Sequence, residues 1–105
     1  MPERAIALAF GLLLAGAAGA AEPTAARQAE LMHRLDQDCG SCHGLTRKGG
    51  LGPALLPAAL AGKDRDGLIA IVLDGVPGTP MPPWRGELSQ DEAAWLVDRL
   101  IEGPQ

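Results

Sequence analysis

The sequence predicts an all-α fold in one small domain, with three to five helices joined by loops. Its 105 residues are enough for one such domain. Three stretches carry helix-forming residues or helix caps, and two segments rich in glycine and proline separate them. A β-strand competes with a helix in only one of the three stretches. The fold class therefore follows from the alternation of helix and loop signals.

The first 20 residues are expected to be a signal peptide that precedes the domain. An apolar run from Ala5 to Ala21 contains Ala18-Gly19-Ala20, which is an A-x-A cleavage pattern. Cleavage leaves residues 21–105 as the mature domain and places it in the periplasm. The alternative is an uncleaved membrane anchor, although the run is shorter than the ~20 residues that a spanning helix needs. The net charge of −4 argues against nucleic acid as a partner.

The stretch from Gln28 to Asp38 predicts the first helix. Leu31, Met32 and Leu35 form one apolar stripe at helical spacing, and charged residues occupy the other face. This helix runs directly into Cys39, so we expect it to carry that residue at its C-terminal end.

Two long loops are expected on either side of the middle helix. Glycine and proline interrupt residues 44–60 repeatedly, with a short helix possible from Pro57 to Ala61. Residues 76–86 contain four prolines and two glycines and are expected to be extended. A loop as long as residues 44–60 in a small domain is usually functional.

The stretch from Asp64 to Asp74 predicts the middle helix. Either Asp64 or Asp66 can cap its N-terminus, and Gly75 stands where a helix C-terminal glycine belongs. Its isoleucine and valine content also fits a buried strand. The caps and the length favour the helix.

The last helix begins after Ser89. Ser89 and Glu92 are spaced as a capping box, in which each side chain bonds the other residue's backbone N–H. Trp95 and neighbouring leucines supply an apolar face, and Gly103-Pro104 ends the helix.

The pentad Cys39-Gly40-Ser41-Cys42-His43 has the C-x-x-C-H pattern of covalent c-type haem attachment. Each thiol can form a thioether with one haem vinyl group, and His43 is then placed to take an axial position on the iron. The alternative is a disulfide between Cys39 and Cys42, but so small a loop stabilises a fold little. The second ring nitrogen of His43 needs a carbonyl acceptor, which the Gly52-Pro53 pair could present.

Met81 is the candidate for the sixth iron ligand. It lies between prolines that restrict the backbone, in a segment without the periodicity of a core methionine. A thioether opposite an imidazole favours Fe(II) and raises the reduction potential. Trp84 follows in the same loop and either packs on the haem edge or shields the proline-rich segment.

The charged residues and the second histidine near these motifs can also be ordinary surface residues. Arg47, Lys48 and Arg85 either flank an exposed haem edge or are solvated charges. His33 is interpreted as a surface residue, because nothing in the chain stands at ligand spacing from it. A zinc site would need more ligands than His33 can add to the pentad.

The pentad, the Gly52-Pro53 loop, the proline-flanked Met81 and the capped final helix together resemble class I c-type cytochromes. The resemblance implies that the first and last helices cross beside the haem, with Trp95 at the crossing. The family usually has glycine or alanine about eight residues before the first cysteine, where this chain has Leu31. The crossing is therefore expected to be wider.

The stretches Gly49–Leu55, Val72–Gly75 and Gly78–Trp84 are similar to the small NirC-type cytochromes of denitrifying bacteria. That resemblance implies a monomeric, monohaem electron carrier that serves haem d1 maturation or donates to nitrite reductase. Two rivals remain open at this point. One is a haem-based sensor or catalyst in which Met81 is displaced, and the other is an assembly protein that uses Cys39 and Cys42 as a dithiol.

Overall fold

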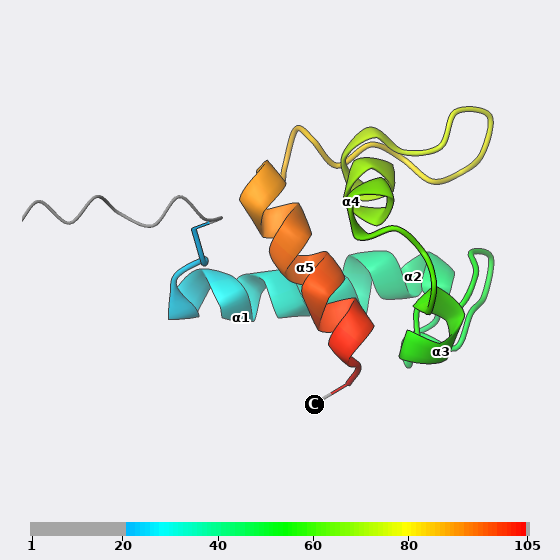
Figure 1. The fold of residues 1–105 in the computed structure, drawn as a ribbon, viewed down its shortest axis with the longest axis horizontal. Helices are drawn as coiled ribbons and strands as arrows, with labels where there is room; N and C mark the ends of the chain where they lie inside the picture. Colours follow the sequence, from blue (N-terminus) through cyan, green and yellow to red (C-terminus); the bar gives the residue numbers. More distant parts are fainter. Residues whose placement is uncertain (1–20, 105) are drawn as a thin grey trace, which may run out of the picture.

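The computed structural model describes residues 21–104, and the expected signal peptide lies outside them. Helices make up the regular structure of this part of the chain, with no strand between residues 21 and 104, so the predicted all-α class is confirmed (Figure 1). Within that range, no helix is both long and apolar enough to cross a membrane. The elements in order are α1 (Ala25–Arg34), η1 (Leu35–Cys39), α2 (Gly40–His43), α3 (Pro57–Leu60), α4 (Arg65–Asp74) and α5 (Gln90–Glu102).

The first three elements form one continuous helical stretch that contains the whole C-x-x-C-H pentad. Thr24 caps its N-terminus, because its Oγ1 accepts a hydrogen bond of 3.2 Å from the Arg27 backbone N–H. The stretch therefore begins three residues before the predicted start at Gln28. It passes through a π-helical turn, a feature common at functional sites, and ends at Gly44 with φ of 93°.

The central and final helices follow their sequence signals. Asp64, and not Asp66, caps α4 by accepting a 2.8 Å hydrogen bond from the Gly67 N–H, and Gly75 ends the helix. The strand alternative is therefore wrong, because these caps satisfy the backbone groups at both helix ends. The predicted capping box of Ser89 and Glu92 is present at the start of α5. The short helix expected near Pro57 is α3.

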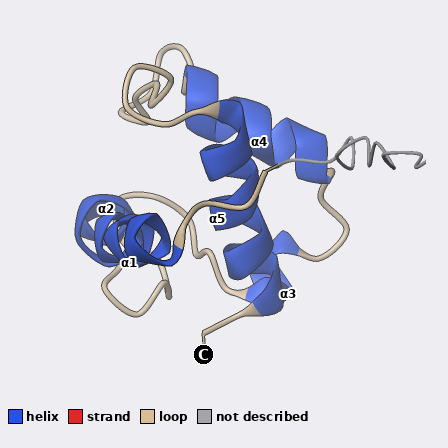
Figure 2. Cartoon of the chain, turned by 90° about the vertical axis from the view of Figure 1, so that its left-hand side faces the viewer, coloured by secondary structure: helices blue, strands red, loops and turns tan. Residues whose placement is uncertain are grey.

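Helix α5 is the centre of the packing, because it contacts α1, α3 and α4. Figure 1 shows it crossing α1, and Figure 2 shows α1 and α2 on one side of the molecule with α4 on another. Leu31 is completely buried at 0% exposure, and so is Ala93 on α5. Trp95 also lies in the core, where the Arg99 guanidinium sits 5.1 Å from the ring centroid. The buried hydrophobic residues are Leu31, Leu35, Leu60, Ile69, Leu73, Leu88, Ala93, Ala94, Trp95, Leu96, Val97 and Leu100.

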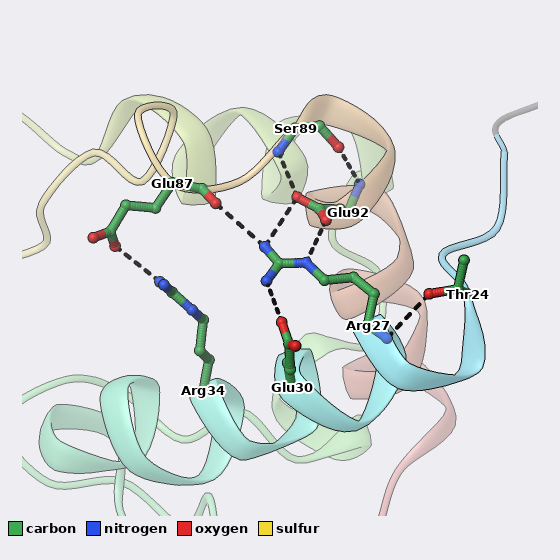
Figure 3. Close-up of polar contacts among 7 residues, drawn as sticks. All are labelled: Thr24, Arg27, Glu30, Arg34, Glu87, Ser89 and Glu92. Carbon is green, nitrogen blue, oxygen red and sulfur yellow. Dashed lines mark hydrogen bonds and ion pairs between the residues drawn. The ribbon is translucent and has the colours of Figure 1, made fainter.

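Arg27 joins the start of α1 to the start of α5 (Figure 3). Its Nε donates to Glu92 at 2.6 Å, and its Nη1 donates to Glu30 at 2.8 Å. Glu92 also accepts a 2.9 Å bond from the Ser89 N–H, so one carboxylate serves both the cap and the ion pair. These hydrogen bonds hold the pKa of Glu92 below its usual value, and the bond from Arg27 has the largest effect. Two segments far apart in sequence are thereby joined at one point.

Candidate haem-binding site

A cavity of about 830 Å³ lies beside α5 and is lined mostly by apolar side chains. Its size falls in the range of roughly 300–1,000 Å³ that is usual for ligand and cofactor sites. The structure brings Cys39, Cys42, His43 and Met81 together on its wall, although Met81 is far from the pentad in sequence. Pro53 lines the same cavity. Two thiols, an imidazole and a thioether around an apolar space are the donor set that a c-type haem requires.

The two cysteines are free thiols and half-buried, so the disulfide alternative does not describe the structure. Because η1 and α2 form one helical stretch, Cys39 and Cys42 lie about one turn apart on the side that faces the cavity. Burial raises the pKa of the Cys39 thiol, and the positive charge of Arg47 opposes that shift. Neither sulfur atom is bonded to the other, so both are available for thioether bonds.

His43 is held from two directions. Its Nδ1 donates a 2.7 Å hydrogen bond to the carbonyl oxygen of Pro53, so the predicted carbonyl partner is present. Because a carbonyl can only accept, this bond places the ring proton on Nδ1 and leaves the lone pair of Nε2 free for a metal. Gly52 lies against the ring: a Cβ at that position would be 2.7 Å from Cε1 and 2.8 Å from Nδ1.

The loop after the pentad folds back onto it through backbone hydrogen bonds. The Gly49 N–H donates to His43 O, and the Gly52 N–H donates to Cys42 O, each at 2.8 Å. The Leu55 N–H donates to Arg47 O at 2.9 Å and closes the loop at its far end. The long loop expected over residues 44–60 is therefore ordered by contacts to the helix that precedes it.

Met81 reaches the cavity from the opposite wall, on the segment that follows α4. This segment doubles back beside the C-terminal end of α4. The Val76 N–H donates to Met81 O at 3.2 Å, and the Trp84 N–H donates to Val72 O at 3.1 Å. Met81 is half-buried, whereas Pro80 and Pro82 on either side are exposed.

Trp84 lies at the cavity, and its predicted packing on a haem edge stays a prediction. It lines the cavity, and it also packs against the buried hydrophobic cluster. Three charged side chains also reach the wall, namely Arg34, Asp38 and Lys63. Arg34 is already paired with Glu87 at 2.9 Å.

Arg47 does not lie where the sequence indicated. It is neither solvated nor beside a cavity opening, because it is only 8% exposed and does not line the cavity. Its φ of 65° is rare for a residue with a side chain, and its guanidinium lies 3.9 Å from Asp36. Arg85 pairs with Asp74 at 2.8 Å, while Lys48 is exposed. Nothing in the local sequence indicates that Arg47 is buried, because the contacts that cover it are tertiary.

Comparison with known proteins shows that the chain is similar to c-type cytochromes. The family model described as cytochrome c oxidase, cbb3-type, subunit III matches residues 24–98. Cytochrome c55X of Pseudomonas aeruginosa is 64% identical over 99 residues, which cover 94% of this chain and 82% of that protein. The solved structure of a c-type cytochrome NirC superposes with a TM-score of 0.76 at 66% identity, covering 78% of this chain and 100% of the other.

A larger relative contains a similar segment. The dihydro-heme d1 dehydrogenase of Pseudomonas aeruginosa is 39% identical over 101 residues. These residues cover 96% of this chain but only 19% of that protein. The whole of the present chain thus corresponds to one part of a much longer protein.

Proposed function

Because the chain belongs to the family of small c-type cytochromes that includes cytochrome c55X and NirC, we propose that it carries single electrons on one covalently bound haem c. The observation that carries this proposal is the single apolar cavity that Cys39, Cys42, His43 and Met81 all line. The chain has only two cysteines, which are enough for one haem. No other set of residues in the described part of the chain combines two thiols with an imidazole and a thioether.

The proposed roles of the residues follow from their geometry. Haem c would supply the one-electron Fe(III)/Fe(II) couple at this site. Cys39 and Cys42 would form the two thioether bonds, and His43 would present Nε2 to the iron because Pro53 holds Nδ1. Met81 would provide the second axial ligand and so raise the reduction potential and close the iron to other ligands.

The apolar wall of the cavity supports the same role. Excluding water from an iron site lowers the local dielectric and favours the form with less charge, which is the reduced one. Side chains from α4, α5 and both loops contribute to that wall. A carrier of this kind docks with its partners briefly and over a small area.

We further propose that the carrier works in the periplasm during denitrification, in haem d1 maturation or as a donor to nitrite reductase. The similarity to cytochrome c55X and NirC supports this setting, as does the segment shared with a dihydro-heme d1 dehydrogenase. Residues 1–20 would direct export and be cleaved in the process, which leaves a mature chain that begins at Ala21.

The mass and spectrum of the exported protein test the proposed cofactor and ligands. We expect a mass equal to residues 21–105 plus one haem, and an oxidised spectrum with the weak near-red band of methionine ligation to Fe(III). Ready binding of carbon monoxide by the reduced protein, with no near-red band, would instead indicate a sensor or catalyst with an open iron. A mass without haem would contradict the proposal entirely and favour a dithiol protein.

Stopped-flow kinetics test the pathway. The reduced protein is mixed with oxidised nitrite reductase, and the oxidised protein is mixed separately with a dihydro-heme d1 dehydrogenase in its reduced state; an unrelated c-type cytochrome serves as the control carrier. We expect electron transfer with at least one of the two enzymes that is faster than with the control carrier. Equal rates for both carriers with both enzymes would contradict the proposed pathway and leave the haem assignment intact.

A further inference from the structure

The segment from Val76 to Arg85, here called the Met81 strap, is tied to α4 by two backbone hydrogen bonds and is closed on itself by a third. The Val76 N–H donates to Met81 O at 3.2 Å, the Trp84 N–H to Val72 O at 3.1 Å, and the Arg85 N–H to Leu73 O at 3.0 Å. The tip of the strap projects away from the helices as the yellow loop in Figure 1. Met81 therefore lies at the base of the loop, where the chain returns to α4, and not at its tip.

Gly75 lies at this base, and the strap passes over it with no room for a side chain. A Cβ at Gly75 would lie 2.7 Å from Met81 O, 2.8 Å from the carbonyl carbon of Pro82 and 2.8 Å from the nitrogen of Pro83. All three atoms belong to the backbone, so no rotamer change can relieve the contact. Two of the three residues are prolines, whose fixed φ further limits how the strap can adjust.

Gly78 and Gly62 serve as comparison positions. They distinguish the effect of the close contact at Gly75 from the cost of a positive φ. Gly75 has φ of 69°, while Gly78 has 81° and Gly62 has 80°, so all three have a positive φ that disfavours side chains. A Cβ at Gly78 or at Gly62 would have nothing within 4 Å. Gly78 belongs to the strap itself. Alanine at Gly78 thus carries the cost of a positive φ without a clash, and alanine at Gly75, where ψ is −174°, carries a conformational cost together with a clash against the Met81 backbone.

We propose that Gly75 is the positioning residue for Met81, and that its close contact with the strap sets how far the methionine side chain enters the cavity. The proposal rests on the proposed function, in which Met81 is an iron ligand. A side chain at position 75 pushes the Met81 carbonyl away and breaks its bond to the Val76 N–H. The pentad belongs to η1 and α2, and none of its residues takes part in the three hydrogen bonds of the strap. Haem attachment is therefore expected to survive a change that displaces Met81.

The test compares Gly75→Ala with Gly78→Ala in the exported holoprotein. The near-red band of the oxidised protein is measured relative to the main haem absorption, together with covalent haem by mass and carbon monoxide binding by the reduced protein. We expect Gly75→Ala to keep its haem, to lose most of the near-red band and to bind carbon monoxide. Gly78→Ala is expected to retain the wild-type band and to exclude carbon monoxide, although both substitutions lower the Tm.

A full near-red band in Gly75→Ala, or an equal loss in both variants, would overturn the proposal. If Gly75→Ala does not accumulate, Val76→Pro decides the question, because it removes the N–H that bonds Met81 O while keeping Gly75. The band is then expected to weaken, and a band of wild-type strength would reject the proposed role of the contact. Absence of the band in the wild-type protein would contradict methionine ligation itself, which is a separate failure.

Discussion

The two walls of the cavity hold their candidate iron ligands by different means. His43 lies on a continuous helical stretch next to Cys42, and its ring is bonded to Pro53 O at 2.7 Å. Met81 lies on a loop that is held by two backbone hydrogen bonds of 3.0 and 3.1 Å to the end of α4. The histidine wall therefore combines local sequence, regular structure and a side-chain hydrogen bond. The methionine wall depends on the tertiary placement of one strap.

Because the two walls are held differently, haem attachment and closure of the iron are expected to depend on different parts of the site. Under the proposed function, attachment of haem needs only the pentad, which stays together because its members are neighbours in one helical stretch. The proposed high potential and closed iron need Met81, whose position depends on contacts between α4 and the strap. Changes to the two walls should therefore produce two distinct kinds of defect.

The largest effect is expected from His43→Ala, which removes the proposed axial ligand on the histidine wall. The apolar cavity would then lose its main contact to haem, and a domain of this size has little other core to compensate. We expect little or no exported protein with covalent haem, measured by mass and by haem absorption per polypeptide. His33→Ala is the matched control, because His33 is exposed, and it should behave as wild type. Normal haem content in His43→Ala would contradict the assigned role.

A smaller effect is expected from Gly52→Ala, which leaves both walls in place but crowds the imidazole. The new Cβ would lie 2.7–2.8 Å from two ring atoms, so the ring must turn and weaken its bond to Pro53 O. Overpacking of this kind costs about 1–3 kcal/mol. We expect covalent haem with a lower Tm and altered ligand-field signals in electron paramagnetic resonance.

Gly86→Ala is the control for this change. A Cβ at Gly86 meets nothing within 4 Å, and neither glycine has a positive φ. Its spectrum and Tm should match the wild type. Identical behaviour of the two alanine variants would show that the contact of Gly52 with the ring is unimportant.

The smallest effect is expected from Glu92→Gln, which lies outside both walls. Since pairing with Arg27 lowers the pKa of Glu92 from its usual 4.5, the folded protein gains stability above that value. The gain is lost as the pH falls through the lower pKa of the folded state. We expect Glu92→Gln to lower the Tm by a few degrees at pH 7 and to match the wild type in acid.

Glu102→Gln provides the comparison, because Glu102 pairs with Arg99 inside α5 and joins no two elements. Its Tm should stay close to the wild type at both pH values. A pH-independent difference for Glu92→Gln would show that the pair with Arg27 does not link the crossing helices.

Local signals in the sequence predicted more of the histidine wall than of the methionine wall. The pentad, the Asp64 cap and the Ser89 capping box each depend on residues close together in the chain, and each was visible there. Met81 could be selected as a candidate because prolines flank it. The contact that places it, between Gly75 and the strap backbone, exists only in the folded chain, where Gly75 otherwise looks like an ordinary helix end.

Tertiary packing also explains the remaining differences. Arg47 looks like a surface charge in the sequence, but the loop that bonds Leu55 to Arg47 O leaves it buried. Leu31 occupies the position where the family usually has a small residue, and Ala93 on α5 is fully buried in the same core. The wider crossing of α1 and α5 that Leu31 predicts stays a prediction, because no local pattern indicates how the facing residues of the two helices pack.

The reduction potential of the holoprotein and of Met81→Ala tests the central claim most directly. Both proteins are titrated under the same conditions, after mass measurement has shown one covalent haem on each. We predict that Met81→Ala keeps its haem, has a clearly lower potential and binds carbon monoxide when reduced. An unchanged potential would contradict Met81 as an iron ligand and, with it, the account of this protein as a closed one-electron carrier.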